Sequence, residues 1–467
     1  MRNYTQGRVA SQVGRVRRQA MVEQDLCFGK LLGAEQVEAA VGRQQVSFRE
    51  RLYSPLMTLW TFLYQVLCPD QSCRAAVARL LAFLGLGGTA EGSARTGAYC
   101  KARGRLAEEL PADLMRTSGR ELEQKVTPAG LLGGRRITIA DGTTVSAPDT
   151  SANQEAYPQP DSQKPGVGFP ILRLVALISL SCGAVLDVAM GPYGGKQSGE
   201  TALLRRLLGD LRSGDVLLAD AMFANYWTIG LLSQRGVDVV SRHDGRRKVD
   251  FRSGRRLGRR DHVVDWPKPG ERPEWMSQEL YDSLPSTVSI REVQVQVDQP
   301  GVRTRHLLVV TTLLDAEDYP AAELAAAYRA RWHAELDLRS IKLAVRMDVL
   351  RGKSPSMLRK EVWMHLLAYN LVRTLMAEAA ARASCGPRDI SFTGTLQTML
   401  AFAPVGWSVP AERWATLYER ILKAVATHRV GDRPNRVEPR AVKRRPKKHT
   451  LLTEPRAIAR ARLLTST

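Results

Sequence analysis

Four polar residues recur along one predicted helix with the spacing Tyr-x2-Arg-x3-Glu-x6-Lys: Tyr328, Arg331, Glu335 and Lys342. At about 100° per residue, all four side chains fall on one face of that helix. One carboxylate among three groups that can grip phosphate suits a site that holds a metal ion beside a DNA backbone. The alternative is a solvated face, on which Arg331 and Glu335 form an i,i+4 ion pair worth about 0.3–0.5 kcal/mol.

Two aspartates are predicted to lie beside one another near this helix. Asp141 follows the predicted strand 136–140, and Asp220 follows the predicted strand 216–219, its expected neighbour in the sheet. Either aspartate could instead be an ordinary turn residue. Three converging acids would repel one another, and at least one would stay protonated, unless a cation is bound. An all-oxygen site favours Mg²⁺ or Mn²⁺ over zinc.

The elements that position these acids are indicated by a change of period after residue 134. Helices are expected at 198–208 and 225–234, and strands at 136–140, 171–180, 184–189, 216–219 and 237–241. The resulting order predicts an α/β fold with a ribonuclease H-like mixed sheet. In that fold the first three strands form an antiparallel meander, and the fourth and fifth run parallel to the first.

The remaining segments suggest further regions around this core. Strand character returns at 306–314, and a long helix is expected over 320–345, with later helices at 360–382 and 411–425. We interpret residues 1–130 as a helical DNA-binding N-terminal region, followed by the first part of the core at 131–242 and a β-rich basic insertion at 243–302. The second part of the core, with the catalytic helix, covers 303–355. A helical C-terminal region at 356–430 is a candidate for dimerisation, and 431–467 form a basic tail that is an extended or disordered arm.

The charge balance points to a polyanionic partner. Among 467 residues, 68 Lys and Arg face 47 Asp and Glu, a net charge of +21, which favours nucleic acid. The cysteines and histidines are too scattered for a zinc site, and 6% aromatic residues offer few platforms for RNA. The apolar stretch 174–186 is too short to span a bilayer, and no apolar segment follows the first arginines, so we expect no membrane partner and a location in the cytosol.

The motif residues resemble those of a known family. Asp141 in Ile-Ala-Asp-Gly-Thr-Thr, Asp220 in Leu-Leu-Ala-Asp-Ala-Met-Phe, and the quartet at 328, 331, 335 and 342 are similar to the DDE transposases of bacterial insertion sequences, in the branch named for its Tyr-Arg-Glu-Lys signature. The resemblance runs from about residue 48 to the basic tail. It implies a bacterial cytosolic, nucleoid-associated enzyme whose three acids are catalytic and bind two Mg²⁺ or Mn²⁺ ions, with a β-rich module inserted before the glutamate.

The same resemblance implies a reaction on double-stranded DNA. The enzyme would bind terminal inverted repeats as a homodimer, hydrolyse one strand, close a hairpin at the transposon end, and join the 3′ ends to target DNA. Tyr328, Arg331 and Lys342 would hold the phosphate of the non-transferred strand. Two alternatives stay open: a metal-dependent nuclease that cuts without joining, and a DNA-binding protein with a vestigial centre.

Trp266, in the predicted insertion, could have either of two roles. Closing a hairpin bends DNA so sharply that a base leaves the stack, and an aromatic ring that receives the base stabilises it by about 1–3 kcal/mol. Trp266 follows a basic run that could guide the backbone to it, so we expect base stacking there. The alternative is that the ring forms the small core of the insertion.

Overall fold

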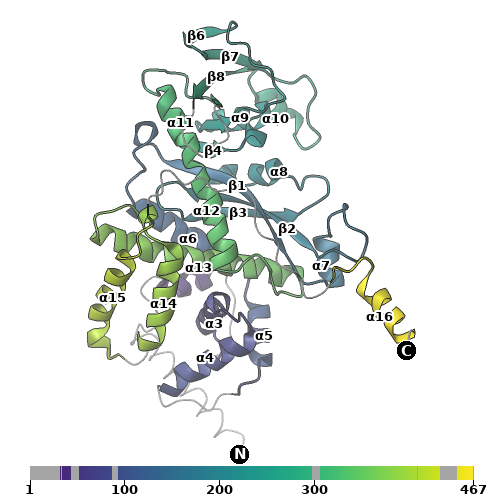
Figure 1. The fold of residues 1–467 in the computed structure, drawn as a ribbon, viewed down its shortest axis with the longest axis vertical. Coiled ribbons are helices and arrows are strands. Elements are labelled where there is room, and N and C mark those ends of the chain that lie inside the picture. The colour runs from purple at the N-terminus through teal and green to yellow at the C-terminus, as the bar shows by residue number, and fades with distance from the viewer. Residues whose placement is uncertain are drawn as a thin grey trace, which may run out of the picture. The chain divides into compact units, whose positions relative to one another are not determined.

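The computed structural model describes residues 32, 34–43, 52–86, 93–296, 306–406, 409–431 and 450–465. The chain divides into two compact units, which are described separately. The helical unit contains residues 1–126, 181–186 and 337–430, and the sheet unit contains residues 127–180, 187–336 and 431–467. Figure 1 labels the elements of both units.

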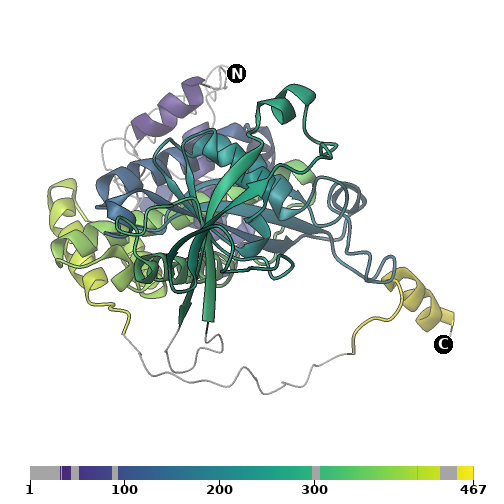
Figure 2. The ribbon, with the colours of Figure 1, turned by 90° about the horizontal axis from the view of Figure 1, so that it is seen from above.

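A nine-stranded sheet has the order β3-β2-β1-β4-β5-β9-β8-β7-β6. Strand β1 is antiparallel to β2 and parallel to β4, and β4 is parallel to β5, which confirms the predicted ribonuclease H-like arrangement. Figure 2 shows the twist of these strands from above. The strands are β1 (Ile137–Ser146), β2 (Ile171–Ser179), β3 (Val185–Pro192), β4 (Val216–Ala219), β5 (Asp238–Arg242), β6 (Arg255–Gly258), β7 (Asp261–Pro267), β8 (Thr287–Gln296) and β9 (His306–Thr311).

The centre of the sheet is apolar because it is covered on both faces. All four residues of β4 are buried, and β2 reads as a nearly continuous apolar run in which only two residues are half-buried. Continuous runs of this kind are typical of strands that are buried on both sides. The short helices of this unit are α7 (Ser151–Ala156), α8 (Glu200–Arg205), α9 (Tyr226–Ser233) and α10 (Gln278–Ser283).

The prediction that the first strand ends before Asp141 is wrong. Strand β1 continues to Ser146, because β2 pairs with it as far as Ser146 and Ile171. The parallel neighbour β4 pairs with β1 only from Ile137 to Ile139. Asp141 therefore lies within a strand, at the point where one of its two neighbours has ended.

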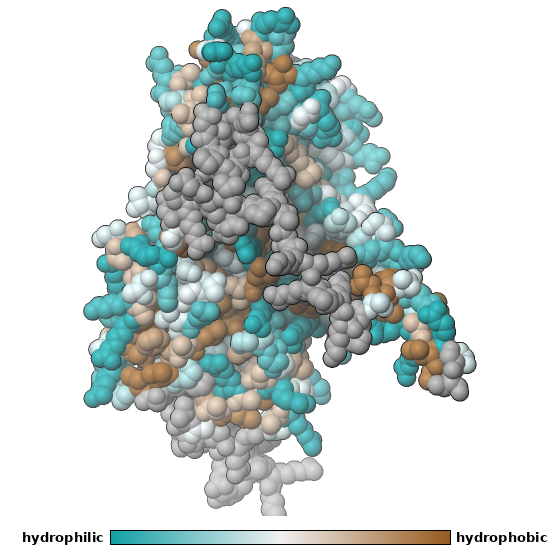
Figure 3. Space-filling view, in the orientation of Figure 1, coloured by the Kyte–Doolittle hydropathy of each residue, from teal (hydrophilic) through white to brown (hydrophobic). Residues whose placement is uncertain are grey.

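The β-rich insertion extends the central sheet. Strand β7 is antiparallel to both of its neighbours, β6 and β8, and β8 pairs with β9, which in turn pairs with β5. Arg291 on β8 forms a buried ion pair with Asp261 on β7 (Nη2–Oδ2 2.6 Å). In the space-filling view, the visible surface where β6 and β7 lie is mostly hydrophilic (Figure 3).

The predicted single helix over 320–345 is interrupted. Helix α11 (Ala321–Ala330) ends at Arg331, helix α12 (Trp332–Arg339) follows, and Ser340–Ala344 form a π-helical turn. A π turn holds more residues than an α turn. A rotation of 100° per residue therefore does not describe the segment from Glu335 to Lys342, and it cannot be used to place both side chains on one helix face.

The helical unit is built around one long helix. Helix α13 (Pro355–Arg382) begins at Ser354, whose hydroxyl accepts a hydrogen bond from the Met357 N–H, and Pro355 suits the first helical position. Most of its residues are buried, and it packs against α3, α6 and α15. The other helices are α2 (Ala34–Arg43), α3 (Pro55–Leu67), α4 (Cys73–Leu86), α5 (Gly97–Arg105), α6 (Glu109–Lys125), α14 (Phe392–Gly406) and α15 (Ala411–Ala426).

An ion cluster is buried in this unit. Asp337, at the end of α12, is fully buried and pairs with Arg373 of α13 and with Arg388 (Nη2–Oδ2 3.0 Å). Arg373 also donates to the Tyr369 hydroxyl (2.8 Å), whose proton is donated to the Gly183 carbonyl (2.9 Å). The charge of Asp337 is thus compensated by two guanidinium groups.

The predicted basic tail is described only in part. Residues 432–449 lie outside the described residues, whereas Arg456–Thr465 form helix α16, which the expectation of an extended arm did not include. Residues 1–31 also lie outside the described residues. No helix among the described residues has the length and apolar character needed to cross a bilayer.

Candidate active site

The two aspartates lie at matching distances along two neighbouring parallel strands, Asp141 within β1 and Asp220 directly after β4. Ile139 of β1 pairs with Leu218 of β4, so Asp141 and Asp220 each follow this pair by two residues. Residues two apart on a strand point to the same face. The sheet thus directs both carboxylates to one face, where β4 has just ended.

Asp141 is held in a mostly buried position. Its side chain is 16% exposed, and its Oδ1 accepts a hydrogen bond from the Gly142 N–H (3.1 Å). Burial raises the pKa of the Asp141 carboxyl to about 6, because the charged form loses solvation. The Arg331 guanidinium and the Gly142 N–H oppose this rise in pKa, and the nearby Glu335 carboxylate adds to it.

Asp220 is fixed by the turn that follows β4. Its Oδ1 accepts a hydrogen bond from the Ala221 N–H (2.7 Å) at the start of a 3-10 turn, Ala221–Phe223. The Ser241 hydroxyl from β5 lies 3.0 Å from both the Ala219 and the Asp220 carbonyl oxygens. The neighbouring strand therefore anchors the backbone that carries Asp220.

Arg331 connects the helix residues to the sheet, because it contacts both Asp141 of β1 and Glu335 of α12. Its guanidinium lies between two acids, with Nη1 3.5 Å from Asp141 Oδ1 and Nη2 3.1 Å from Glu335 Oε1. The guanidinium carbon lies 5.9 Å from the centre of the Tyr328 ring. Burial raises the pKa of the Tyr328 hydroxyl, with Arg331 opposing the rise and Asp220 adding to it. Tyr328, Arg331 and Glu335 therefore gather beside the two aspartates.

Lys342, the last residue of the predicted quartet, falls in a different unit from the other three residues. Lys342 belongs to the helical unit, whereas Glu335 belongs to the sheet unit. In the helical unit Lys342 lines a cavity of about 320 Å³ together with Arg346 and Arg351.

A fourth acid at this site, Glu200, was missed by the sequence analysis. A Cβ at position 142 would meet the Glu200 carboxyl, so this carboxyl lies directly against Gly142 of β1. Burial raises the pKa of Glu200, Arg173 opposes the rise, and Asp220 adds to it. In the sequence, Glu200 was only an acid in the first turn of a predicted helix, which is where acids commonly stabilise helices.

Trp266 is placed in the core of the insertion. The residue is 3% exposed, its indole N–H donates to Glu292 Oε1 (3.1 Å), and the Arg247 guanidinium covers its ring at 3.9 Å. At 3% exposure the ring is enclosed by the protein in this structure. The alternative considered for this residue, a core role, therefore describes the observed position.

The acids suit a divalent cation, although no preformed cluster is present. Among the described residues, no group of three His, Cys, Asp or Glu side chains is arranged to hold a metal ion. The donor set nevertheless consists only of carboxylates from β1, β4 and α12, which hard cations prefer. The Arg331 guanidinium already places a positive charge between Asp141 and Glu335. The residues therefore fit a metal that would add positive charge at this position.

A ribonuclease H-like sheet with acids at these positions defines a class of enzymes that cut phosphodiester bonds. A family model described as the transposase DDE domain matches residues 132–371, which are 240 of the 467 residues. The chain belongs to this family and is a DDE transposase, an enzyme that acts on DNA.

Individual relatives extend this result. Transposase InsG for insertion sequence element IS4 of Escherichia coli strain K12 is 27% identical over 359 residues, which cover 75% of this chain and 77% of that protein. The transposase for insertion sequence element IS421 of Escherichia coli is 34% identical over 67 residues, 14% of this chain and 18% of that protein. A piggyBac transposase, solved as a synaptic complex with hairpin DNA, aligns over 85% of this chain and 84% of its own with 9% identity and a TM-score of 0.44.

Proposed function

We propose that this transposase belongs to the branch with the Tyr-Arg-Glu-Lys signature, and that it excises an insertion sequence through hairpin ends. One observation carries the proposal: Asp141 and Asp220 each follow the paired residues Ile139 and Leu218 by two positions, and Arg331 links Asp141 to Glu335. The InsG and IS421 names support an insertion sequence as the substrate. The reaction begins with hydrolysis at the terminal inverted repeats and ends with joining of the 3′ ends to target DNA.

Asp141, Asp220 and Glu335 are the residues that would hold the metal, as two Mg²⁺ or Mn²⁺ ions. The ions would supply an activated water and stabilise the leaving 3′-oxygen. The protein itself contributes the placement of the carboxylates. Strand register fixes the two aspartates, and the bond from Arg331 to Glu335 fixes the glutamate.

Arg331, Tyr328 and Lys342 are proposed to bind the phosphate of the non-transferred strand. The Arg331 guanidinium has further N–H groups beside those that face the two acids, and a planar guanidinium can bind phosphate in a bidentate manner. Tyr328 lies one helical turn before Arg331, and its hydroxyl is proposed to bind the same phosphate. Once the first strand is cut, its 3′-hydroxyl attacks the opposite strand, which closes the hairpin and releases the flanking DNA. Hydrolysis of the hairpin then frees the 3′-hydroxyl again for attack on target DNA, and none of these steps needs a covalent protein intermediate.

The flanking regions are assigned by charge and packing. We propose that residues 1–130 and the insertion 243–302 contact DNA phosphates, because much of the +21 net charge must be matched by the substrate. We propose that residues 356–430 contribute to a homodimer that holds two ends, and that the tail from 431 contacts the second duplex. The bacterial cytosol, at the nucleoid, is the proposed location.

Product analysis tests this proposal. Wild-type protein, a labelled duplex with the terminal repeat that flanks the coding region, and a target plasmid are incubated with Mg²⁺. We expect a nick, then a hairpin on denaturing gels, and then joined product in the plasmid. Cut ends that never form a hairpin or joined product would overturn the proposal and identify a nuclease.

A further inference from the structure

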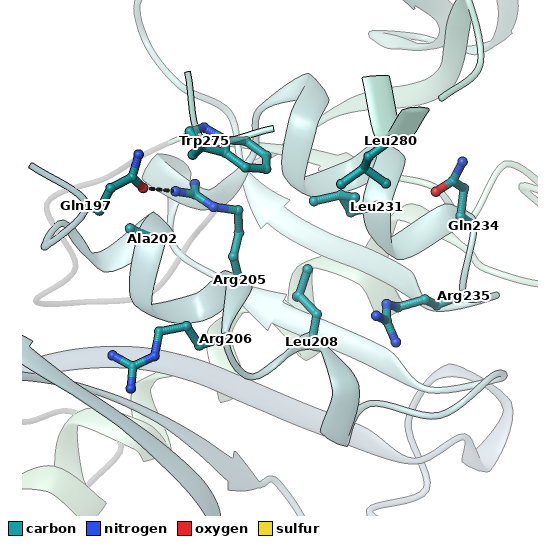
Figure 4. A pocket seen from close by; sticks show the side chains of 10 residues that line it. All are labelled: Gln197, Ala202, Arg205, Arg206, Leu208, Leu231, Gln234, Arg235, Trp275 and Leu280. Carbon is teal, nitrogen blue, oxygen red and sulfur yellow. Dashed lines mark hydrogen bonds between the residues drawn. The ribbon is translucent and has the colours of Figure 1, made fainter. Parts of the chain in front are cut away.

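A basic pocket of the sheet unit lies outside the proposed catalytic residues. It encloses about 610 Å³ and is lined by residues of α8, α9 and α10 and of the segments beside them (Figure 4). Three of its lining residues are arginines, Arg205, Arg206 and Arg235, and none is an aspartate or glutamate. A concave surface with three positive charges and no acid in its wall favours an anion.

Arg205 is held in a fixed orientation within this pocket. Its guanidinium carbon lies 3.8 Å from the centre of the Trp275 ring, and its Nη2 donates to Gln197 Oε1 (2.9 Å). Gln197 has a positive φ of 59°, which costs energy for a residue with a side chain. Stacking and this hydrogen bond leave the remaining N–H groups of Arg205 for a ligand. Burial lowers the pKa of Arg205, and no acidic neighbour contributes to that change.

The other two arginines that line the pocket are exposed. Arg206 is exposed and donates to the Met190 carbonyl (2.8 Å), and Arg235 is exposed just after α9. Figure 4 shows Arg205 and Arg206 on one side of the pocket and Arg235 on the other. An anion within the pocket would therefore meet positive charge from two sides.

Helix α8 connects the pocket to the proposed catalytic acids. Its first residue, Glu200, reaches Gly142 beside Asp141, and its last residue, Arg205, lines the pocket. Five residues of helix span roughly 7.5 Å at 1.5 Å per residue. Successive phosphates of one DNA strand are about 3.4 Å apart in rise, so this span corresponds to roughly two nucleotides.

We propose that the pocket formed by Arg205, Arg235 and Trp275 binds one backbone phosphate of the transposase's DNA substrate, a few nucleotides from the cleavage position. The assignment rests on the proposed function, since the DNA must enter the site beside Asp141. Trp275 supports Arg205 from behind, because its ring is covered by the guanidinium. Contacts of this kind position DNA and carry no sequence preference.

Binding measured without cleavage tests this pocket. The affinity for the end duplex is measured by fluorescence anisotropy across a salt series in EDTA, for wild type, Arg205→Gln, Arg235→Gln and Arg413→Gln. Each lost phosphate contact lowers the salt slope by about 0.9. We expect that loss for Arg205→Gln and Arg235→Gln, and an unchanged slope for Arg413→Gln, which removes the same charge from the exposed surface of α15. Arg205→Lys should restore the slope, because it restores the charge.

A phosphate scan makes the test specific. Phosphates near the cleavage position are replaced one at a time by uncharged methylphosphonates. Wild type should lose affinity at one of these positions, and Arg205→Gln should show no further loss there. Unchanged salt slopes in both pocket variants, or an equal loss of slope in Arg205→Lys and Arg205→Gln, would overturn the assignment. A wild-type protein that fails to bind the end duplex at all would instead overturn the proposed function.

Discussion

Replacing Asp141 with asparagine should stabilise the protein at neutral pH while it removes a proposed catalytic group. The Asp141 carboxyl is 16% exposed, and burial raises its pKa from 3.8 to about 6, against the opposing effect of Arg331. At pH 7 the folded protein therefore carries a buried charge that the unfolded chain would solvate. Asparagine has a similar shape and no charge, so the variant avoids this cost.

The pKa difference gives the size and the sign of the effect. One pKa unit corresponds to about 1.4 kcal/mol, so the ionised carboxyl costs about 3 kcal/mol at pH 7. Between pH 3.8 and about 6 the folded state binds more protons than the unfolded state, so stability falls as the pH rises through this window. Below the window the carboxyl is neutral in both states and the cost vanishes. At pH 5 about half of the cost remains.

Urea unfolding at pH 5 and pH 7 measures the effect. The gain of Asp141→Asn over wild type should roughly double between the two values, while Asp149→Asn, an exposed control, should stay within about 0.5 kcal/mol at both. Mg²⁺ should raise the melting temperature of wild type more than that of Asp141→Asn. An Asp141→Asn variant that is less stable than wild type at pH 7 would refute the reasoning, because it would show that the carboxylate stabilises the fold.

Three further predictions concern the buried ion cluster, the insertion and the quartet. Asp337→Asn should lower the free energy of unfolding by about 3–5 kcal/mol in a urea titration, because two buried guanidinium groups lose their counter-charge. The control Glu419→Gln breaks an exposed ion pair and should cost at most about 1 kcal/mol in the same titration. Trp266→Ala should cost about 3–5 kcal/mol in chemical unfolding, and a change below about 0.5 kcal/mol would return the ring to a surface role. Lys342→Ala should reduce hairpin formation on gels and lower the salt slope of end binding by about 0.9, and no change in either would remove Lys342 from the DNA interface.

The core of the fold could be predicted because its signals are local. The four residues of β4 form a short apolar run, and the order of strands and helices after residue 134 identifies the sheet topology. The end of β1 could not be predicted in this way. It depends on pairing with β2 through Ser146, and nothing in the sequence near Asp141 reports on that partner. The pairing of β8 with β9, which makes the insertion part of the sheet, is equally non-local.

Strand register and helix spacing allow part of the candidate site to be predicted from the sequence. They predict that Asp141 lies near Asp220 and that Arg331 lies one helical turn before Glu335. Glu200 was missed because its approach to Gly142 joins residues from separate elements. Lys342 was placed by a rule for α-helices that the π turn at Ser340–Ala344 breaks. Sequence alone did not show that Glu292 and Arg247 would contact Trp266, and base stacking at this residue stays a prediction.

Single-turnover cleavage of the end duplex tests most directly whether Asp141, Asp220 and Glu335 form one catalytic site. Asp141→Asn, Asp220→Asn and Glu335→Gln are compared with wild type and with Glu155→Gln, an exposed control, at matched DNA occupancy in Mg²⁺. We predict that each of the three variants binds the duplex and fails to cut it, while Glu155→Gln cuts at the wild-type rate. Cleavage within about tenfold of wild type, a barrier change of only about 1.4 kcal/mol, would contradict the assignment of that acid.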